Sequence, residues 1–169
     1  DGRWAAVSRI EEGTSEADIW VYDLVRGAET RLARPGVDDF SPIFSADGGT
    51  IYFGSKGSGS KDSVVLRRDL ASGVETELFT HGDRYLLPSS ISGDGGSLLY
   101  DLGDETSLGV YDVMLRPLAK DATERTVVGS EGDDSSSQVS PDGRWIAWAS
   151  DESGQYEVYV APFPGPGAR

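Results

Sequence analysis

Short hydrophobic runs rich in Val, Ile, Leu, Tyr and Trp follow one another along the whole chain. Segments rich in Gly, Ser and Asp separate these runs; Asp18–Leu24 and Ser63–Leu70 are two clear examples of a run. Runs of four to eight residues rich in β-branched and aromatic side chains, bounded by turn residues, predict β-strands. No stretch shows the longer period of an amphipathic helix, so the pattern predicts an all-β protein.

The pattern repeats. Four segments begin with Asp-Gly and continue into a hydrophobic run, and their Asp residues are 46, 47 and 48 positions apart. A Ser stands two residues before the last three of these Asp residues. The four segments are Asp1–Val7, Asp47–Phe53, Asp94–Tyr100 and Asp142–Trp148. Regular self-similarity of this kind indicates a repeat architecture.

Each Asp-Gly lies between two runs of strand character, which predicts a hairpin turn. Gly adopts a positive φ without strain, and an Asp side chain accepts hydrogen bonds from nearby turn amides. We therefore assign a structural role in turns to four pairs of residues: Asp1 and Gly2, Asp47 and Gly48, Asp94 and Gly95, and Asp142 and Gly143.

Each period contains four predicted strands, which is typical of a β-propeller blade. The run that leads into each next turn would be the innermost strand: Phe40–Ser45, Tyr85–Ser92 and Ser135–Ser140. On this assignment residues 1–169 form a single domain with two complete and two partial blades of antiparallel strands, with repeats starting near 1, 47, 94 and 142. We expect a fragment of a larger propeller, with apolar blade faces exposed.

The segment Ser140–Trp148, which reads Ser-Pro-Asp-Gly-Arg-Trp-Ile-Ala-Trp, resembles the Ser-Pro-Asp-Gly repeat of TolB-like, WD40-like β-propellers. The run Ile19–Leu24 resembles the strand that follows this repeat. Ala46 and Gly93 replace the Pro in the second and third copies, so those two copies match less well. The resemblance covers nearly the whole chain and implies the propeller fold.

Residues 151–167 resemble the propeller region C-terminal to many bacterial serine/threonine protein kinases. This resemblance implies a non-catalytic module for protein or ligand binding or for sensing, and it favours a bacterial, extracytoplasmic location. Related propellers also gate substrate access in prolyl-oligopeptidase-type serine peptidases, which is the alternative function. A free-standing periplasmic scaffold is the third candidate function. Each rests on fold-level analogy.

The chain has 169 residues, with 15 Lys and Arg against 29 Asp and Glu, and a formal net charge of −14. This acidity argues against nucleic-acid binding, which requires Lys and Arg to neutralise phosphates. No apolar run approaches the roughly 20 residues of a membrane-spanning helix. The chain contains no Cys, which excludes disulfides, thiolate metal sites and a cysteine nucleophile.

Catalytic motifs are equally sparse. A Ser-His-Asp triad would depend on the single histidine, His81, and the sequence has no Gly-x-Ser-x-Gly elbow. The stretch Gly54–Lys61 lacks the spacing of a phosphate-binding loop and is interpreted as a flexible hairpin loop. We therefore predict no enzymatic activity, no cofactor and no metal site for this chain.

Two acidic pairs, Asp38-Asp39 and Asp133-Asp134, occupy equivalent positions eight to nine residues before the next turn Asp. The corresponding stretch between them contains Asp83, Arg84 and Tyr85. These positions lie where the chain enters an innermost strand, so we predict a ligand site at the mouth of the central channel. Carboxylates there would attract a cation or a partner with a basic segment. The alternative is that they are ordinary acids of a solvated surface.

Overall fold

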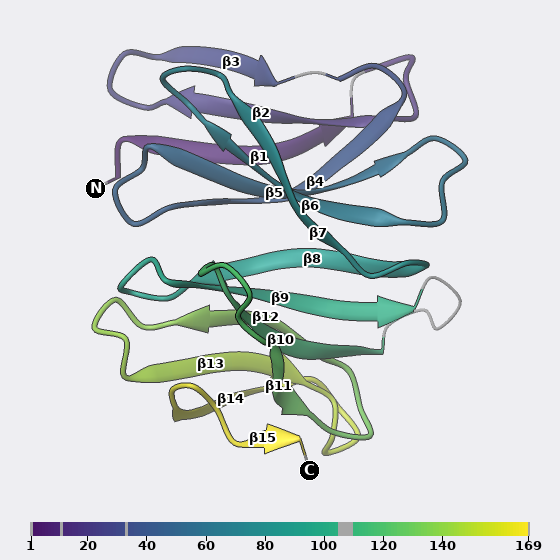
Figure 1. Ribbon diagram of the computed structural model, residues 1–169, viewed down its shortest axis with the longest axis vertical. Helices are drawn as coiled ribbons and strands as arrows, with labels where there is room; N and C mark the ends of the chain where they lie inside the picture. Colours follow the sequence, from purple (N-terminus) through teal and green to yellow (C-terminus); the bar gives the residue numbers. More distant parts are fainter. Residues whose placement is uncertain (1, 11, 33, 105–109, 169) are drawn as a thin grey trace. The chain divides into compact units, whose positions relative to one another are not determined.

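The computed structural model describes residues 2–10, 12–32, 34–104 and 110–168 (Figure 1). Over these residues the chain forms fifteen β-strands and no helix. The strands form four sheets, and the chain divides into two compact units, Asp1–Asp83 and Arg84–Arg169, here called unit 1 and unit 2. The prediction of an all-β chain built from antiparallel blades is confirmed.

Unit 1 contains a three-stranded sheet, blade 1, and a four-stranded sheet, blade 2. In both, each strand pairs with the next one along the chain in antiparallel fashion. Blade 1 consists of β1 (Trp4–Ile10), β2 (Ala17–Asp23) and β3 (Ala28–Leu32); blade 2 consists of β4 (Val37–Phe44), β5 (Thr50–Gly57), β6 (Ser63–Asp69) and β7 (Glu75–Thr80). Blade 1 thus corresponds to the second, third and fourth strands of the repeat.

Unit 2 has the same plan with the partial blade last. Blade 3 consists of β8 (Arg84–Ile91), β9 (Ser97–Asp104), β10 (Tyr111–Pro117) and β11 (Arg125–Gly129); blade 4 consists of β12 (Asp134–Val139), β13 (Trp145–Ser150) and β14 (Glu157–Pro162). A short strand that the sequence did not predict, β15 (Gly167–Ala168), pairs in parallel with the outer edge of β11. The chain therefore returns from blade 4 to extend blade 3 by a fifth strand.

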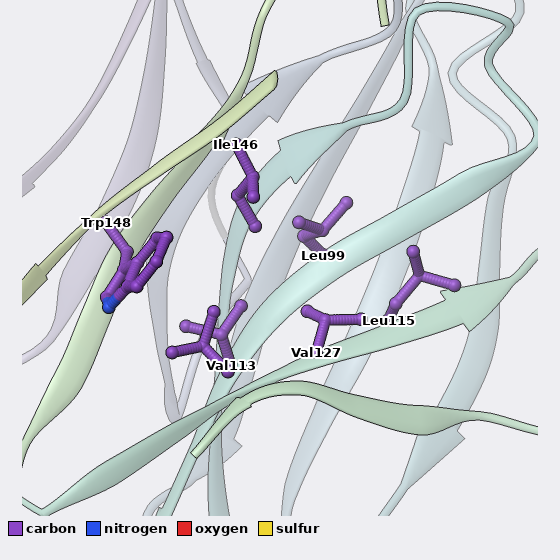
Figure 2. Packing of buried hydrophobic residues seen from close by; sticks show 7 residues of the cluster. Leu99, Val113, Leu115, Val127, Ile146 and Trp148 are labelled. Atoms are coloured by element: carbon purple, nitrogen blue, oxygen red, sulfur yellow. The ribbon is translucent and has the colours of Figure 1, made fainter. Parts of the chain in front are cut away.

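The hydrophobic cores lie between the blades of each unit. In unit 1, Ile19 and Val21 on β2 pack against Ile51, Phe53 and Leu66 of blade 2. In unit 2, Ile146 and Trp148 on β13 face the aliphatic side chains of blade 3 (Figure 2). The blade 3 side of this cluster comprises Leu99, Val113, Leu115, Val127 and Val128. Each fully buried aliphatic side chain stabilises the fold by about 2 kcal/mol, so each blade face depends on its neighbour for burial.

The innermost strands begin earlier than the hydrophobic pattern predicts: β4 begins at Val37 rather than Phe40, and β12 begins at Asp134 rather than Ser135. Both contain a β-bulge, where the pairing register with the next strand shifts by one residue. Ser41 and Ser136 lie in these bulges with φ of 51° and 57°. The sequence does not reveal the bulges, because a bulge is defined by the pairing with the next strand.

Candidate functional site

The acidic pair of blade 2 lies within β4, where both carboxylates are held by neighbours. The Asp38 Oδ1 accepts a hydrogen bond from the backbone N–H of Ala17, the first residue of β2, at 2.8 Å. Asp39 is fully buried and binds the Arg34 guanidinium, with Nη2 2.5 Å from its Oδ1. Burial raises the pKa of Asp39, while the hydrogen bond from Arg34 acts in the opposite direction.

The acidic pair of blade 4 lies at the start of β12. Asp133 accepts hydrogen bonds from the backbone N–H of Tyr111, at 3.0 Å, and from the Tyr156 hydroxyl, at 2.8 Å. Asp134 is fully buried, and its Oδ2 accepts the backbone N–H of Ser130 at 2.7 Å. Its Oδ1 has no hydrogen-bond partner among the described residues.

The two pairs share one structural role. Asp38 and Asp133 each bind the backbone N–H of the first residue of the third strand in the preceding blade, namely Ala17 of β2 and Tyr111 of β10. An unpaired N–H at a strand end is costly when shielded from water, so a carboxylate there fixes the preceding blade. Sequence spacing identified the equivalence of the pairs, and the contacts explain it.

The three residues predicted between the pairs lie around the start of β8. Asp83 is exposed at the end of unit 1. In unit 2, Arg84 forms an ion pair with Asp104 across β8 and β9, with Nε 3.0 Å from Oδ1. Tyr85 is half-buried and pairs with Gly103. The structure therefore places Asp38, Asp39 and Asp83 in unit 1 and the other four predicted site residues in unit 2.

Asp101, on β9, is a buried carboxylate that the sequence reading missed. Its side chain is 5% exposed, and its Oδ2 accepts the backbone N–H of the bulge residue Ser136 at 2.8 Å. Burial is the main cause that raises the pKa of Asp101 to about 7, and the nearby charge of Asp133 acts in the same direction. The sequence carries no signal that could have found it, because which side of β9 faces the next blade is known only from the structure.

Polar contacts around Asp101 join blade 3 to blade 4. The Ser89 and Ser137 hydroxyls are 2.8 Å apart, and the Gln138 amide donates to the Ser89 carbonyl at 2.6 Å. The backbone N–H of Val139 donates to the Ser90 hydroxyl at 3.1 Å. Polar contacts thus connect β8 and β12, the innermost strands of the two blades.

A hollow of about 640 Å³ opens beside Asp133 in unit 2. Four carboxylates line it, from Glu131, Asp133, Asp151 and Glu152, and its described lining includes no basic side chain. The remaining lining residues are Val110, Ser130, Gly132 and Gly154. The Asp151 Oδ1 accepts the backbone N–H of Asp133 at 2.8 Å, which fixes one wall of the hollow. We call this feature the acidic hollow.

The predicted turn residues adopt one geometry in the three turns for which the contacts are described. In the first of these, the Ser45 hydroxyl donates to Asp47 Oδ1 at 2.6 Å, and that oxygen also accepts the Gly49 N–H at 3.0 Å. Ser92 with Asp94 and Ser140 with Asp142 repeat the hydroxyl contact at the same distance. These hydroxyl contacts lower the pKa of all three Asp side chains.

The turn glycines all lie in the left-handed region. Gly2, Gly48, Gly95 and Gly143 have φ between 69° and 71°. Asp1, the first residue assigned to a turn, lies outside the described residues.

The described residues contain no group of three or more His, Asp or Glu side chains arranged to hold a metal ion. No helix in this part of the chain is long and apolar enough to cross a membrane. His81 packs its ring edge-on against Phe79, with centroids 6.1 Å apart.

No protein-family model matches the chain, and no curated protein matches it significantly. Solved structures do match. A putative TolB from Agrobacterium tumefaciens is 21% identical over 91% of this chain and 54% of that one, with a TM-score of 0.72. TolB from Acinetobacter baumannii is 18% identical over 96% and 39%, with a TM-score of 0.70. A structure from a study of two prolyl endopeptidases is 16% identical over 96% and 27%, with a TM-score of 0.66.

The chain thus spans between 27% and 54% of the length of these three solved structures. At these identities the likeness concerns the fold. The repeat of four-stranded antiparallel blades and the match to both TolB structures lead to one conclusion: the chain has the fold of a TolB-like β-propeller.

Proposed function

We propose that this chain is a non-catalytic binding or sensing module whose ligand or protein partner presents a basic segment. The acidic hollow carries the proposal: four carboxylates surround one opening in unit 2, and none of its described lining residues is basic. A cationic side chain entering it would replace carboxylate–carboxylate repulsion by attraction. Asp133, one of the predicted channel-mouth residues, forms part of its wall.

Four other predicted channel-mouth residues stabilise the unit in which each of them lies. Asp38, Asp39 and Asp134 fix strands, and Arg84 is paired with Asp104. In unit 2, the exposed Glu131 and Glu152 on the rim of the hollow meet the ligand.

We place the module C-terminal to a bacterial receptor-type serine/threonine kinase, on the resemblance of residues 151–167. The second candidate is the propeller of a serine peptidase, which the similarity to a prolyl endopeptidase structure favours. The sequences that flank this chain in its gene decide between the two. A kinase domain upstream supports the first, and a hydrolase domain with a Gly-x-Ser-x-Gly elbow downstream contradicts it.

Binding of a fluorescent hexa-arginine peptide tests the acidic hollow. The double variant Glu131→Gln with Glu152→Gln should weaken binding about fivefold or more, since each exposed charge contributes up to about 1 kcal/mol. The matched control is Glu29→Gln with Glu77→Gln, which removes two charges from exposed positions in unit 1. The control should change the affinity less than about twofold. Equal weakening by both double variants would mean that the peptide responds only to the net charge of the chain.

A further inference from the structure

Asp112 and Asp134 of unit 2 occupy the same positions of the repeat as Asp18 and Asp39 of unit 1. Asp112 is the second residue of β10, as Asp18 is the second residue of β2. Asp134 and Asp39 each stand eight residues before the next turn Asp. The two positions are acidic together or apolar together, since the intervening repeat has Val64 and Leu86 there. Residues that vary together indicate a shared environment.

In unit 1 each acid of this set binds an arginine. The Arg31 Nε donates to the Asp18 Oδ2 at 2.8 Å, and the Arg34 Nη2 donates to the Asp39 Oδ1 at 2.5 Å. Both arginines and Asp18 line the hollow of about 340 Å³ in unit 1. Charge-assisted hydrogen bonds between a guanidinium and a carboxylate are among the strong ones in proteins. The two acids are thus guanidinium-binding groups in unit 1.

The first of these arginines is replaced by an uncharged residue in unit 2. Arg31 pairs with Trp20 in the ladder between β2 and β3. At the matching place in the ladder between β10 and β11, Met114 pairs with Thr126. Thr126 is half-buried, and its hydroxyl donates to the Met114 sulfur at 3.4 Å. No cationic side chain therefore reaches Asp112 from this position of β11.

The second arginine is replaced by a glycine. Arg34 stands five residues before the second acid of its set, and the residue five before Asp134 is Gly129. A Cβ added at Gly129 would lie 2.8 Å from the Asp112 Oδ1 and 3.1 Å from the Thr126 Cγ2. The Asp112 carboxylate thus lies against the backbone at the point where an arginine side chain would begin.

The acids of unit 2 keep a hydrogen-bonding capacity that the described residues do not use. Asp134 is fully buried, its Oδ2 accepts the backbone N–H of Ser130, and its Oδ1 has no hydrogen-bond partner in this part of the chain. Burial raises the pKa of Asp112, the charge of Asp134 acts in the same direction, and Arg84 acts in the opposite one. Arg84 also forms an ion pair with Asp104 at 3.0 Å. A donor that reached the Asp134 Oδ1 would remove the cost of leaving a buried carboxylate oxygen unpaired.

The acidic hollow lies next to this pair of acids. Ser130, whose backbone N–H binds Asp134, lines the hollow, and so does Val110, two residues before Asp112. Asp112 is half-buried, whereas Asp134 is fully buried. A cationic side chain that enters the hollow therefore comes close to both acids.

We propose that Asp112 and Asp134 bind the guanidinium group of an arginine that the partner inserts from the acidic hollow, in the role that Arg31 and Arg34 have in unit 1. This inference rests on the proposed function, because it specifies which basic side chain the partner presents. A guanidinium is planar and can donate to two carboxylates at once, whereas an ammonium is a compact and strongly hydrated charge. The site should therefore select arginine over lysine.

Thermal denaturation of the purified chain with methylguanidinium, and with methylammonium at the same concentration, tests the site without a peptide. At about 1 to 20 mM, methylguanidinium should raise the unfolding midpoint about 2 °C more than methylammonium does. Asp112→Asn should abolish this difference, whereas the control Asp62→Asn, which removes an exposed charge in unit 1, should retain it. Circular dichroism records the midpoint and shows that each variant is folded.

Thr126→Arg is the complementary variant, because it supplies the missing cation from the position that Arg31 occupies in unit 1. It should raise the unfolding midpoint without any ligand and remove the response to methylguanidinium. A wild-type chain that responds equally to the two ions, or an Asp112→Asn variant that keeps the full difference, would overturn the inference.

Fluorescent hexa-arginine and hexa-lysine peptides separate this inference from the proposed function. The wild-type chain should bind hexa-arginine about fivefold or more tightly than hexa-lysine, and Thr126→Arg should remove that preference. Glu131→Gln with Glu152→Gln should weaken both peptides alike and leave the preference unchanged. Equal binding of the two peptides that still depends on Glu131 and Glu152 would support the proposed function and contradict the arginine site. A response to methylguanidinium that requires Asp112, without any peptide binding, would support the site and contradict the proposed function.

Discussion

Asp39 in unit 1 and Asp134 in unit 2 occupy the same position of the repeat, eight residues before the next turn Asp, and both are fully buried. Their surroundings differ. Asp39 binds the Arg34 guanidinium, whereas Asp134 accepts a single backbone N–H and keeps an oxygen without a partner among the described residues. The repeat determines where a carboxylate is buried, and a residue outside the repeated pattern determines whether its charge is compensated.

The hollows of the two units show the same contrast. Arg31 and Arg34 line a hollow of about 340 Å³ in unit 1 together with Glu16 and Asp18. The acidic hollow of unit 2 has four carboxylates instead. The hollow of unit 1 is thus lined by both arginines and acids, whereas the described lining of the unit 2 hollow includes acids and no arginine or lysine, which suits the cationic partner proposed above.

The largest effect should come from Asp101, which unit 2 holds where the repeats of unit 1 have Ser8 and Gly54. The native state keeps this carboxyl protonated up to a pKa of about 7, whereas the unfolded chain releases the proton near pH 4. The free energy of unfolding should therefore fall as the pH rises from about 4 to about 7, by as much as about 4 kcal/mol. Asp101→Asn should remove this fall.

Urea denaturation at a series of pH values measures this effect as the difference between the Asp101→Asn variant and the wild-type chain. The difference should favour the variant increasingly up to neutral pH and then stay constant. Asp104→Asn, at a site 46% exposed, is the control and should give a small difference across this range. A difference between Asp101→Asn and wild type that does not depend on pH would show that Asp101 is ionised throughout.

A smaller effect should separate the two equivalent carboxylates directly. Asp39→Asn removes the closer of the two carboxylates that pair with the Arg34 guanidinium, leaving Glu75 at 3.7 Å, and should lower the free energy of unfolding by about 2 kcal/mol. In Asp134→Asn the amide oxygen still accepts the Ser130 N–H, so the change should stay within about 1 kcal/mol of zero. Urea denaturation at neutral pH compares the variants. Equal losses at both sites would contradict the view that Arg34 distinguishes the two units.

Much of the fold was predictable because its signals are local. The Asp-Gly turns and the short hydrophobic runs are each contained in a few residues, so the blades and their order could be derived from the spacing of these signals. The acidic pairs were recognised as equivalent for the same reason. Their partners could not be predicted, since Ala17 and Tyr111 lie in a neighbouring blade and contact depends on how the blades pack.

The buried acid Asp101 and the strand β15 escaped prediction for related reasons. Nothing in an alternating strand distinguishes an Asp that faces solvent from one that faces the next blade. β15 is only two residues long and depends on an edge of β11 that the sequence does not display. The bulges at Ser41 and Ser136 likewise follow from the pairing of whole strands.

The smallest expected effect concerns these two bulge residues, one in each unit. A β-branched side chain is strained at positive φ, so Ser41→Val and Ser136→Val should each lower the free energy of unfolding by about 1 kcal/mol or more. Ser41→Gly and Ser136→Gly are the matched controls and should be nearly neutral, because Gly adopts this φ without strain. Thermal and urea denaturation of the four variants measure both effects. Both bulge residues have a positive φ. Equal losses would therefore show that the two units have the same backbone conformation at this position and differ in charge. A valine that is tolerated in one unit would show that the bulge of that unit rearranges.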